Sequence, residues 1–128
     1  MKRILMLLCA LLFVSGCAGE KKEPDPLDTK EAVPVKMVYE RRWEYYASAE
    51  SEDKELISAV KEKIKSFKIG AKSDIMTEDF TDVIVFVYAD GSEERFVFEG
   101  YNIVLEKEEY EVEGDLRGLR TLLEKCFE

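Results

Sequence analysis

The sequence predicts an α+β domain: an antiparallel meander sheet of four to five strands with two helices on one face, in the order β-α-β-β-β-β-α. Strand-like runs follow one another through tight turns over residues 81–113, which favours antiparallel neighbours. Two stretches with apolar residues at helical spacing, residues 51–68 and 116–127, interrupt and close this series. These two patterns together indicate a two-layer fold.

The first strand prediction covers residues 33–46, where apolar and polar side chains alternate. Met37, Tyr39 and Trp43 fall on one side, and mostly charged residues fall on the other. This period of two is typical of one long strand or of two consecutive strands. Arg41 lies on the apolar side and is the one residue that the alternation does not explain.

Residues 51–68 form the clearest predicted helix. Its apolar face consists of residues at helical spacing: Leu56, Val60, Ile64 and Phe67. Ser51 is a suitable N-cap, and Gly70 offers the left-handed conformation that ends many helices. The pattern leaves room for an extra short strand near Ile69.

The second half of the chain contains the meander and a closing helix. Its strands are expected at residues 82–88, 93–99, 103–105 and 110–113. Asp90-Gly91 is a strong signal for a two-residue hairpin turn between the first two. The closing helix, residues 116–127, has these inward-facing residues: Leu116, Leu119, Leu122, Leu123 and Cys126.

A two-residue loop fixes the register of this hairpin and therefore its two faces. Val85 then faces Phe96, on a wholly apolar side that suits the two helices. The other side of the hairpin is amphipathic and is the predicted contact surface, with the binding candidates Phe86, Tyr88, Arg95 and Val97. The alternative is that the N-terminal strand or a loop folds over this second side.

Val14-Ser15-Gly16-Cys17 follows a short apolar run that opens with Lys2 and Arg3, and it resembles the lipobox of bacterial lipoproteins. The apolar run is too short for a membrane span of about 20 residues. The resemblance implies a cleaved signal peptide at residues 1–16 and lipidation of Cys17. A flexible tether, residues 17–32, would then carry a single domain, residues 33–128. The alternative is an ordinary secretory signal cleaved after Gly16 or Ala18.

Composition excludes several classes of function. The chain has 28 acidic residues against 19 basic ones and a net charge of −9, so it should be repelled by nucleic acid and by anionic lipid headgroups. It has no histidine, which excludes His-based triads and metal sites that use histidine. Cys126 would be the one thiol left after lipidation, and a buried structural role is expected for it. No cofactor is predicted.

Two groups of acidic residues could offer oxygen ligands to Ca²⁺. One group surrounds a predicted loop: Asp74, Glu78, Asp79 and Asp82. The other crowds a turn: Glu106, Glu108 and Glu109. Neither has the spacing of an EF-hand loop, so a solvated surface is the default interpretation and these residues are weak metal candidates. A pair of carboxylates for glycoside hydrolysis is the last-ranked alternative, because no motif distinguishes a pair.

Residues 40–46, Glu-Arg-Arg-Trp-Glu-Tyr-Tyr, interleave arginine with aromatic residues. This pattern can stack on sugar rings or form cation–π contacts. The favoured interpretation is structural, with Trp43 and Tyr45 in or near the core of a strand.

From residue 81 onward, the Asp-Gly-Ser hairpin, a strand led by Tyr110 and a leucine-rich closing helix resemble small lipoprotein domains of Gram-positive bacteria. The resemblance covers about the last third of the chain and implies a fold, with no catalytic residues. We therefore expect a lipid-anchored extracytoplasmic binding module of the cell envelope that is not an enzyme. Its partner would be an envelope protein or a small ligand, and its site the outer face of the cytoplasmic membrane. Ala18 is compatible with onward sorting to the outer membrane in a Gram-negative host.

Overall fold

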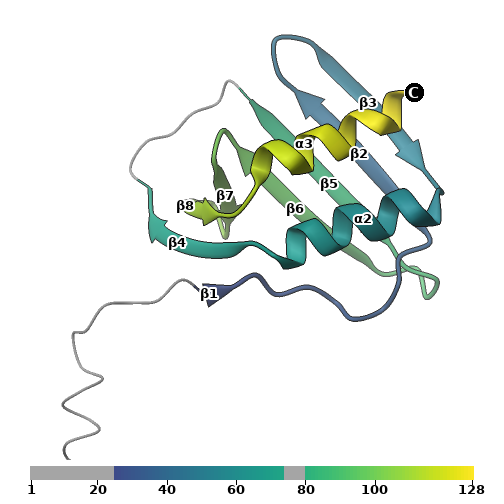
Figure 1. Cartoon of the computed structure of the whole chain (residues 1–128), viewed down its shortest axis with the longest axis horizontal. Helices are drawn as coiled ribbons and strands as arrows, with labels where there is room; N and C mark the ends of the chain where they lie inside the picture. The colour runs from purple at the N-terminus through teal and green to yellow at the C-terminus, as the bar shows by residue number, and fades with distance from the viewer. Residues whose placement is uncertain (1–24, 74–79) are drawn as a thin grey trace, which may run out of the picture.

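The computed structural model describes residues 25–73 and 80–128, which form one antiparallel sheet with two helices packed on one side (Figure 1). The eight strands are β1 (Asp25–Pro26), β2 (Lys36–Arg42), β3 (Tyr46–Ser51), β4 (Lys68–Lys72), β5 (Thr81–Val87), β6 (Glu93–Glu99), β7 (Asn102–Leu105) and β8 (Glu108–Glu113). Their order across the sheet is β1-β4-β8-β7-β6-β5-β2-β3. The helices are α2 (Lys54–Lys65) and α3 (Leu116–Glu124), and α3 continues into a short 3₁₀ turn, η1 (Lys125–Phe127).

The α+β class is confirmed, and the sheet is larger than the four to five strands expected. The alternating N-terminal segment contains one strand, β2. The next strand, β3, shares only Tyr46 with that segment and was not predicted; it pairs with β2 in register from Met37↔Ser51 to Arg42↔Tyr46. A further strand, β4, contains Ile69 and pairs with β8. The remaining addition, β1, pairs with β4 through only two residues, and so short a strand leaves no periodic signal in a sequence.

Helix α2 begins later than the sequence suggested because its cap is Asp53 rather than Ser51. The Asp53 carboxylate accepts hydrogen bonds from the backbone N–H groups of Glu55 and Leu56, at 3.0 and 3.4 Å. The Ser51 hydroxyl instead accepts a hydrogen bond from the backbone N–H of Asp53, just before the helix begins. Of the expected face, Val60 and Ile64 are fully buried, Leu56 is half-buried, and Phe67 is buried but lies beyond the end of the helix. Ile57 is also fully buried.

The β5–β6 hairpin has a register that differs by one residue from the expected one. Val87 pairs with Glu93, Val85 with Arg95, and Ile84 with Phe96. The loop holds three residues rather than two: the N–H of Gly91 donates to the carbonyl of Tyr88 at 2.9 Å, and Gly91 then has a φ of 86°. This is a type I turn followed by a left-handed glycine, the usual construction of three-residue hairpin loops.

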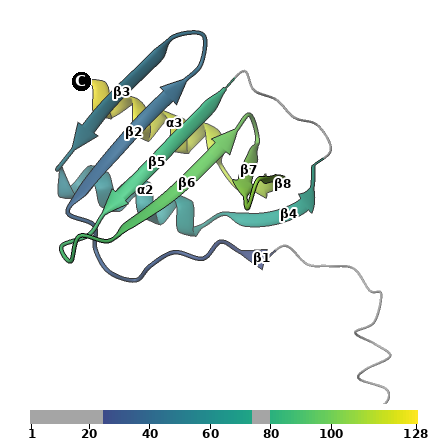
Figure 2. The same ribbon diagram turned by 180° about the vertical axis from the view of Figure 1, so that it is seen from behind.

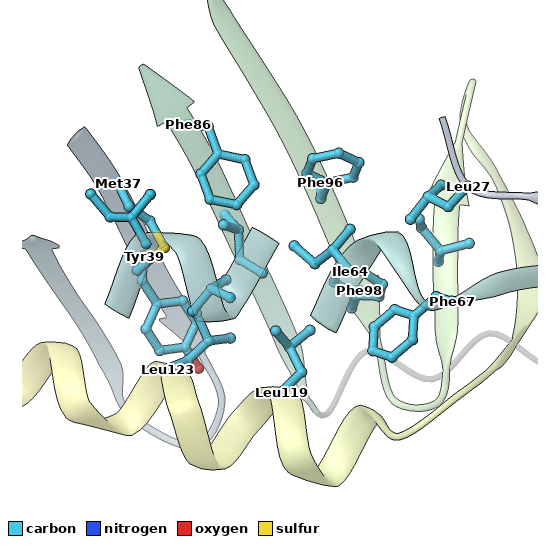
Figure 3. Packing of buried hydrophobic residues seen from close by; sticks show 14 of the residues in the cluster. Leu27, Met37, Tyr39, Ile64, Phe67, Phe86, Phe96, Phe98, Leu119 and Leu123 are labelled. Atoms are coloured by element: carbon cyan, nitrogen blue, oxygen red, sulfur yellow. The ribbon is translucent and has the colours of Figure 1, made fainter. Parts of the chain in front are cut away.

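This one-residue shift moves the side chains of β5 to the opposite face, while those of β6 keep the face expected for them. Ile84 and Phe86 point toward the helices together with Phe96 and Phe98, and all four are buried (Figure 3). The predicted contact surface is therefore wrong as a set. Phe86 and Tyr88 belong to the core side, whereas Arg95 and Val97 lie on the opposite side of the sheet.

The core between the sheet and the helices is rich in aromatic residues. Phe67, which follows α2, packs edge-to-face on Phe98 with 5.9 Å between ring centroids (Figure 3). Gly114, just before α3, has a φ of 152°, and a Cβ there would lie 2.2 Å from the Phe67 ring. Only glycine lets the chain pass this ring. The inward face of α3 is as expected, with Leu116, Leu119 and Leu123 buried.

Residues 25–32, expected in the flexible tether, lie on the domain. Leu27 is buried in the core cluster, and its N–H donates to the carbonyl of Phe67 at 3.3 Å. The backbone N–H of Lys30 donates to Glu94 at 2.8 Å, and the Lys61 ammonium donates to the carbonyl of Ala32. The domain thus includes residues 25–32, which were expected in the tether. Leu27 is a single apolar residue among charged ones, so composition alone indicated a linker.

The predicted signal peptide and the predicted lipidation site, Cys17, lie outside the described residues. Within residues 25–73 and 80–128, no helix is long and apolar enough to cross a membrane.

Candidate binding surface

The side of the sheet opposite the helices, here called the open face, carries a row of valines bordered by charged residues. No helix of the described chain covers it (Figure 2). Val38 lies beside Val85, and Val83 lies beside Val97, on the adjacent strands β2, β5 and β6. Of the predicted binding residues, Arg95 is exposed here and Val97 is half-buried. The open face therefore keeps two of the four predicted residues.

The other two predicted residues have structural roles. Phe86 is fully buried and packs edge-to-face on Phe96, with 6.0 Å between centroids. Tyr88 is 4% exposed; its hydroxyl donates to Glu94 at 2.6 Å and accepts from Lys61 at 2.9 Å. Burial raises the pKa of the Tyr88 hydroxyl, and burial lowers the pKa of the Lys61 ammonium. This network fastens residues 30–32 to the domain.

Exposed aromatic side chains gather elsewhere, at the end of the sheet where β2 turns into β3. They border a hollow of about 250 Å³, here called the aromatic hollow, which is lined by Arg41, Trp43, Glu44, Tyr45, Ala47 and Phe80. Tyr45 is 78% exposed and Phe80 is 50% exposed. Trp43 and Phe80 pack edge-to-face, with 5.2 Å between ring centroids. So much exposed aromatic surface around one depression is typical of a contact site.

Arg41 forms the inner wall of the aromatic hollow. Its guanidinium carbon lies 4.3 Å from the centroid of Trp43 and 5.0 Å from that of Phe127, within cation–π range. Its Nε donates to the Tyr39 hydroxyl at 3.2 Å, and its Nη2 lies 3.6 Å from a Glu124 carboxylate oxygen. These contacts explain why a charged residue occupies the apolar side of β2.

Beneath this wall lies a buried carboxylate, Asp82, which is 1% exposed. It accepts hydrogen bonds from the Tyr39 hydroxyl, from Trp43 Nε1 at 3.2 Å and from Arg120 Nε at 2.7 Å. Arg120 also donates to the carbonyl of Gly100. Three donors on one buried carboxylate hold the indole of Trp43 at a fixed angle. Burial, together with the adjacent Asp82, raises the pKa of Tyr39.

Part of this site was predicted from the sequence, and the rest was not. Residues 40–46 stood out; Tyr39 is buried and Trp43 packs on Phe80, but Tyr45, expected in or near the core of a strand, is 78% exposed in the turn between β2 and β3. Phe80 and Arg120 were missed because each comes from a distant part of the chain and neither lies in a local motif. The expected register gave no signal for them, because it placed Asp82, which shares the parity of Ile84, on the side away from the helices.

The acidic metal candidates do not converge in the described structure. Glu108 accepts from Lys72 at 2.9 Å and from Tyr110 at 3.1 Å, whereas its neighbour Glu109 is buried and accepts from Asn102 at 3.3 Å. Successive strand residues point to opposite faces, so these two carboxylates cannot share an ion. Glu106 lies in the β7–β8 turn with a φ of 50°. Asp74, Glu78 and Asp79 lie outside the described residues.

The remaining candidates are weaker. Cys126 is half-buried, and burial raises the pKa of its thiol, which makes the thiol less reactive. A larger hollow, of about 560 Å³, lies between Val33 and the polar outer side of α2. It has no aromatic lining residue, so the aromatic hollow is the better candidate site.

Comparison with known proteins adds no identification, since no family model, curated protein or solved structure shows significant similarity to this chain. The assignment of function therefore rests on the geometry described above.

Proposed function

We propose that this protein is a lipid-anchored, extracytoplasmic binding module of the cell envelope, and that it is not an enzyme. The aromatic hollow would receive an apolar or aromatic side chain of another envelope protein. The observation that carries this proposal is the exposure of Tyr45 and Phe80 around a hollow whose wall is held rigid by Asp82 and Arg41.

Aromatic side chains suit this role because they offer large contact areas at a low cost in conformational entropy. Trp43 is already fixed by its hydrogen bond to Asp82 and by Arg41 against its ring. Little rotamer freedom remains to be lost when a partner binds. Tyr45 and Phe80 then supply the exposed area that becomes buried on contact, as in the hot spots of many interfaces.

The size of the hollow favours a protein partner over a small molecule. Sites that enclose small ligands usually measure about 300–1,000 Å³ and bury most of the ligand. The aromatic hollow measures about 250 Å³ and is open on one side. It is large enough to seat one side chain that projects from a larger surface.

The chemistry of the site is also that of binding. Asp82, the buried carboxylate that holds Trp43, is 1% exposed with three donors already bound to it. Reaching a substrate proton would require breaking these bonds. In this proposal Asp82 therefore positions Trp43 and takes no part in a reaction.

The proposed anchor is a lipid on Cys17, which lies only eight residues before the docked segment at Asp25. So short a connection spans less than about 30 Å even when fully extended. The β2–β3 turn lies at the end of the sheet remote from β1 (Figures 1 and 2). The aromatic hollow would thus face away from the membrane, toward partners in the envelope.

The test is affinity capture of the tagged full-length protein after cross-linking in intact cells. Tyr45→Ser combined with Phe80→Ser should reduce the yield of a partner at least tenfold, while Val33→Ser, an equally drastic change at a 71% exposed residue, should not. The melting temperature of each variant is measured to confirm folding. Equal partner yields from the three proteins would overturn the proposal.

A further inference from the structure

Strand β3 is the last strand of the sheet on the side opposite β1. All six of its residues pair with β2, and no other described strand lies on its outer side. An edge of this length presents unpaired backbone N–H and C=O groups that can accept another strand.

Natural edge strands are usually protected by lysine, proline, a bulge or extreme shortness. The opposite edge follows this rule, since β1 has two residues and one of them is Pro26. β3 has none of these features. Its sequence is Tyr-Ala-Ser-Ala-Glu-Ser, and its register with β2 is regular from end to end. Only the β1 edge of the sheet therefore carries features that protect it against pairing with another strand.

Neighbouring elements leave this edge accessible. The side chains of Ala47, Ser48 and Ala49 are too small to shield the backbone. The nearby η1 turn packs over the inner face of the sheet, where Phe127 lies against Tyr39 with 5.6 Å between ring centroids.

We infer that β3 pairs antiparallel with β3 of a second copy of this chain, about a two-fold axis through Ser48 and perpendicular to the sheet. Such an axis keeps the helices of both copies on the same side, so each residue must meet one of the same parity. Ser48 then meets Ser48, Ala47 meets Ala49, and Tyr46 meets Glu50. The result is one continuous antiparallel sheet through both copies.

The distribution of charge along β3 is the argument for a second copy of this chain as its partner. In a strongly acidic chain, β3 contains only one charged residue, Glu50, and that residue is neutralised by Lys36 at 3.2 Å. The two-fold pairing places no like charges opposite each other. It also gives the exposed phenol of Tyr46, 65% exposed in one copy, a carboxylate on its partner.

The first test uses thiol cross-linking of the full-length protein in membranes, in a Cys126→Ser background. Ser48→Cys should give a product of twice the monomer mass with a short thiol-to-thiol cross-linker. Ser58→Cys, a matched change on the exposed side of α2, should give no more than the background. A Ser48→Cys yield no higher than that control, or a product with a different protein, would overturn the inference.

The second test uses charge at the proposed axis. Ser48→Lys and Ser48→Glu each place like charges opposite each other, which should weaken self-association in detergent about fivefold. A mixture of the two variants should restore it, because unlike charges then meet. Unchanged self-association of the single variants, or failure of the mixture to associate, would contradict the pairing. Neither test changes a residue that lines the aromatic hollow, so its outcome is separate from that of the proposed binding function.

Discussion

Asp82→Asn is the most informative single perturbation of the candidate site. Asp82 is 1% exposed and accepts from Tyr39, Trp43 and Arg120. Asparagine has the same shape but one acceptor oxygen in place of two, and its amide N–H₂ must meet a donor. The Arg120 guanidinium, whose side chain is 17% exposed, then loses its charged partner.

Removing one member of a buried ion pair usually costs 3–5 kcal/mol. The lower end applies here, because Arg120 keeps some exposure and its hydrogen bond to the carbonyl of Gly100. We expect a loss of about 3 kcal/mol in the free energy of unfolding, or about 12 °C in melting temperature for a domain of this size.

The assay is urea unfolding of the full-length protein in detergent, followed by the fluorescence of Trp43, the chain's single tryptophan. Arg120→Met and the double variant complete a double-mutant cycle. The double variant should lose at least 1 kcal/mol less than the sum of the two single losses, because neither charge is then left alone. A loss below about 1 kcal/mol for Asp82→Asn, or strictly additive losses, would refute this reasoning.

Three further predictions concern the fold. Gly114→Ala should destabilise the protein by about 2–4 kcal/mol in urea unfolding, because its Cβ would lie 2.2 Å from the Phe67 ring. The control, Gly91→Ala, is also at positive φ but has nothing within 4 Å, so it should cost only about 1 kcal/mol. Similar losses for the two variants would contradict the clash. Phe86→Ala should cost about 3–5 kcal/mol, measured in the same way, and a near-neutral result would place Phe86 on the open face after all. Tyr39 has a folded-state pKa raised above its ordinary value of 10, so its stabilising contribution is complete below pH 10 and is lost as pH rises further. The difference in free energy of unfolding between the wild type and Tyr39→Phe should therefore shrink above pH 10. A difference that stays constant would argue against this role of the Tyr39 hydroxyl.

Much of the fold could be predicted because its signals are local. Apolar periodicity identified both helices and most of their buried residues, and the alternation over residues 33–46 pointed to β2. The hairpin register could not be predicted, since a two-residue loop and a three-residue loop both call for glycine at Gly91. The expected register also gave a cleaner apolar face than the real one.

The real register places a carboxylate at each end of the inward face, Asp82 on β5 and Glu94 on β6. Each is satisfied by a tyrosine hydroxyl, from Tyr39 and Tyr88 respectively. Such partners come from other elements and leave no trace in the hairpin's own sequence. The aromatic hollow was only half visible for the same reason, since Phe80 lies far from residues 40–46 along the chain.

The central claim is that the aromatic hollow is the surface that contacts a protein partner. The most direct measurement is site-specific photo-cross-linking in living cells, with a photoreactive phenylalanine analogue replacing Tyr45 in one strain and Val33 in another. Both residues are more than 70% exposed, at 78% and 71%. We expect a discrete protein adduct from position 45 and none from position 33. No adduct from position 45, or the same adduct from both positions, would contradict it.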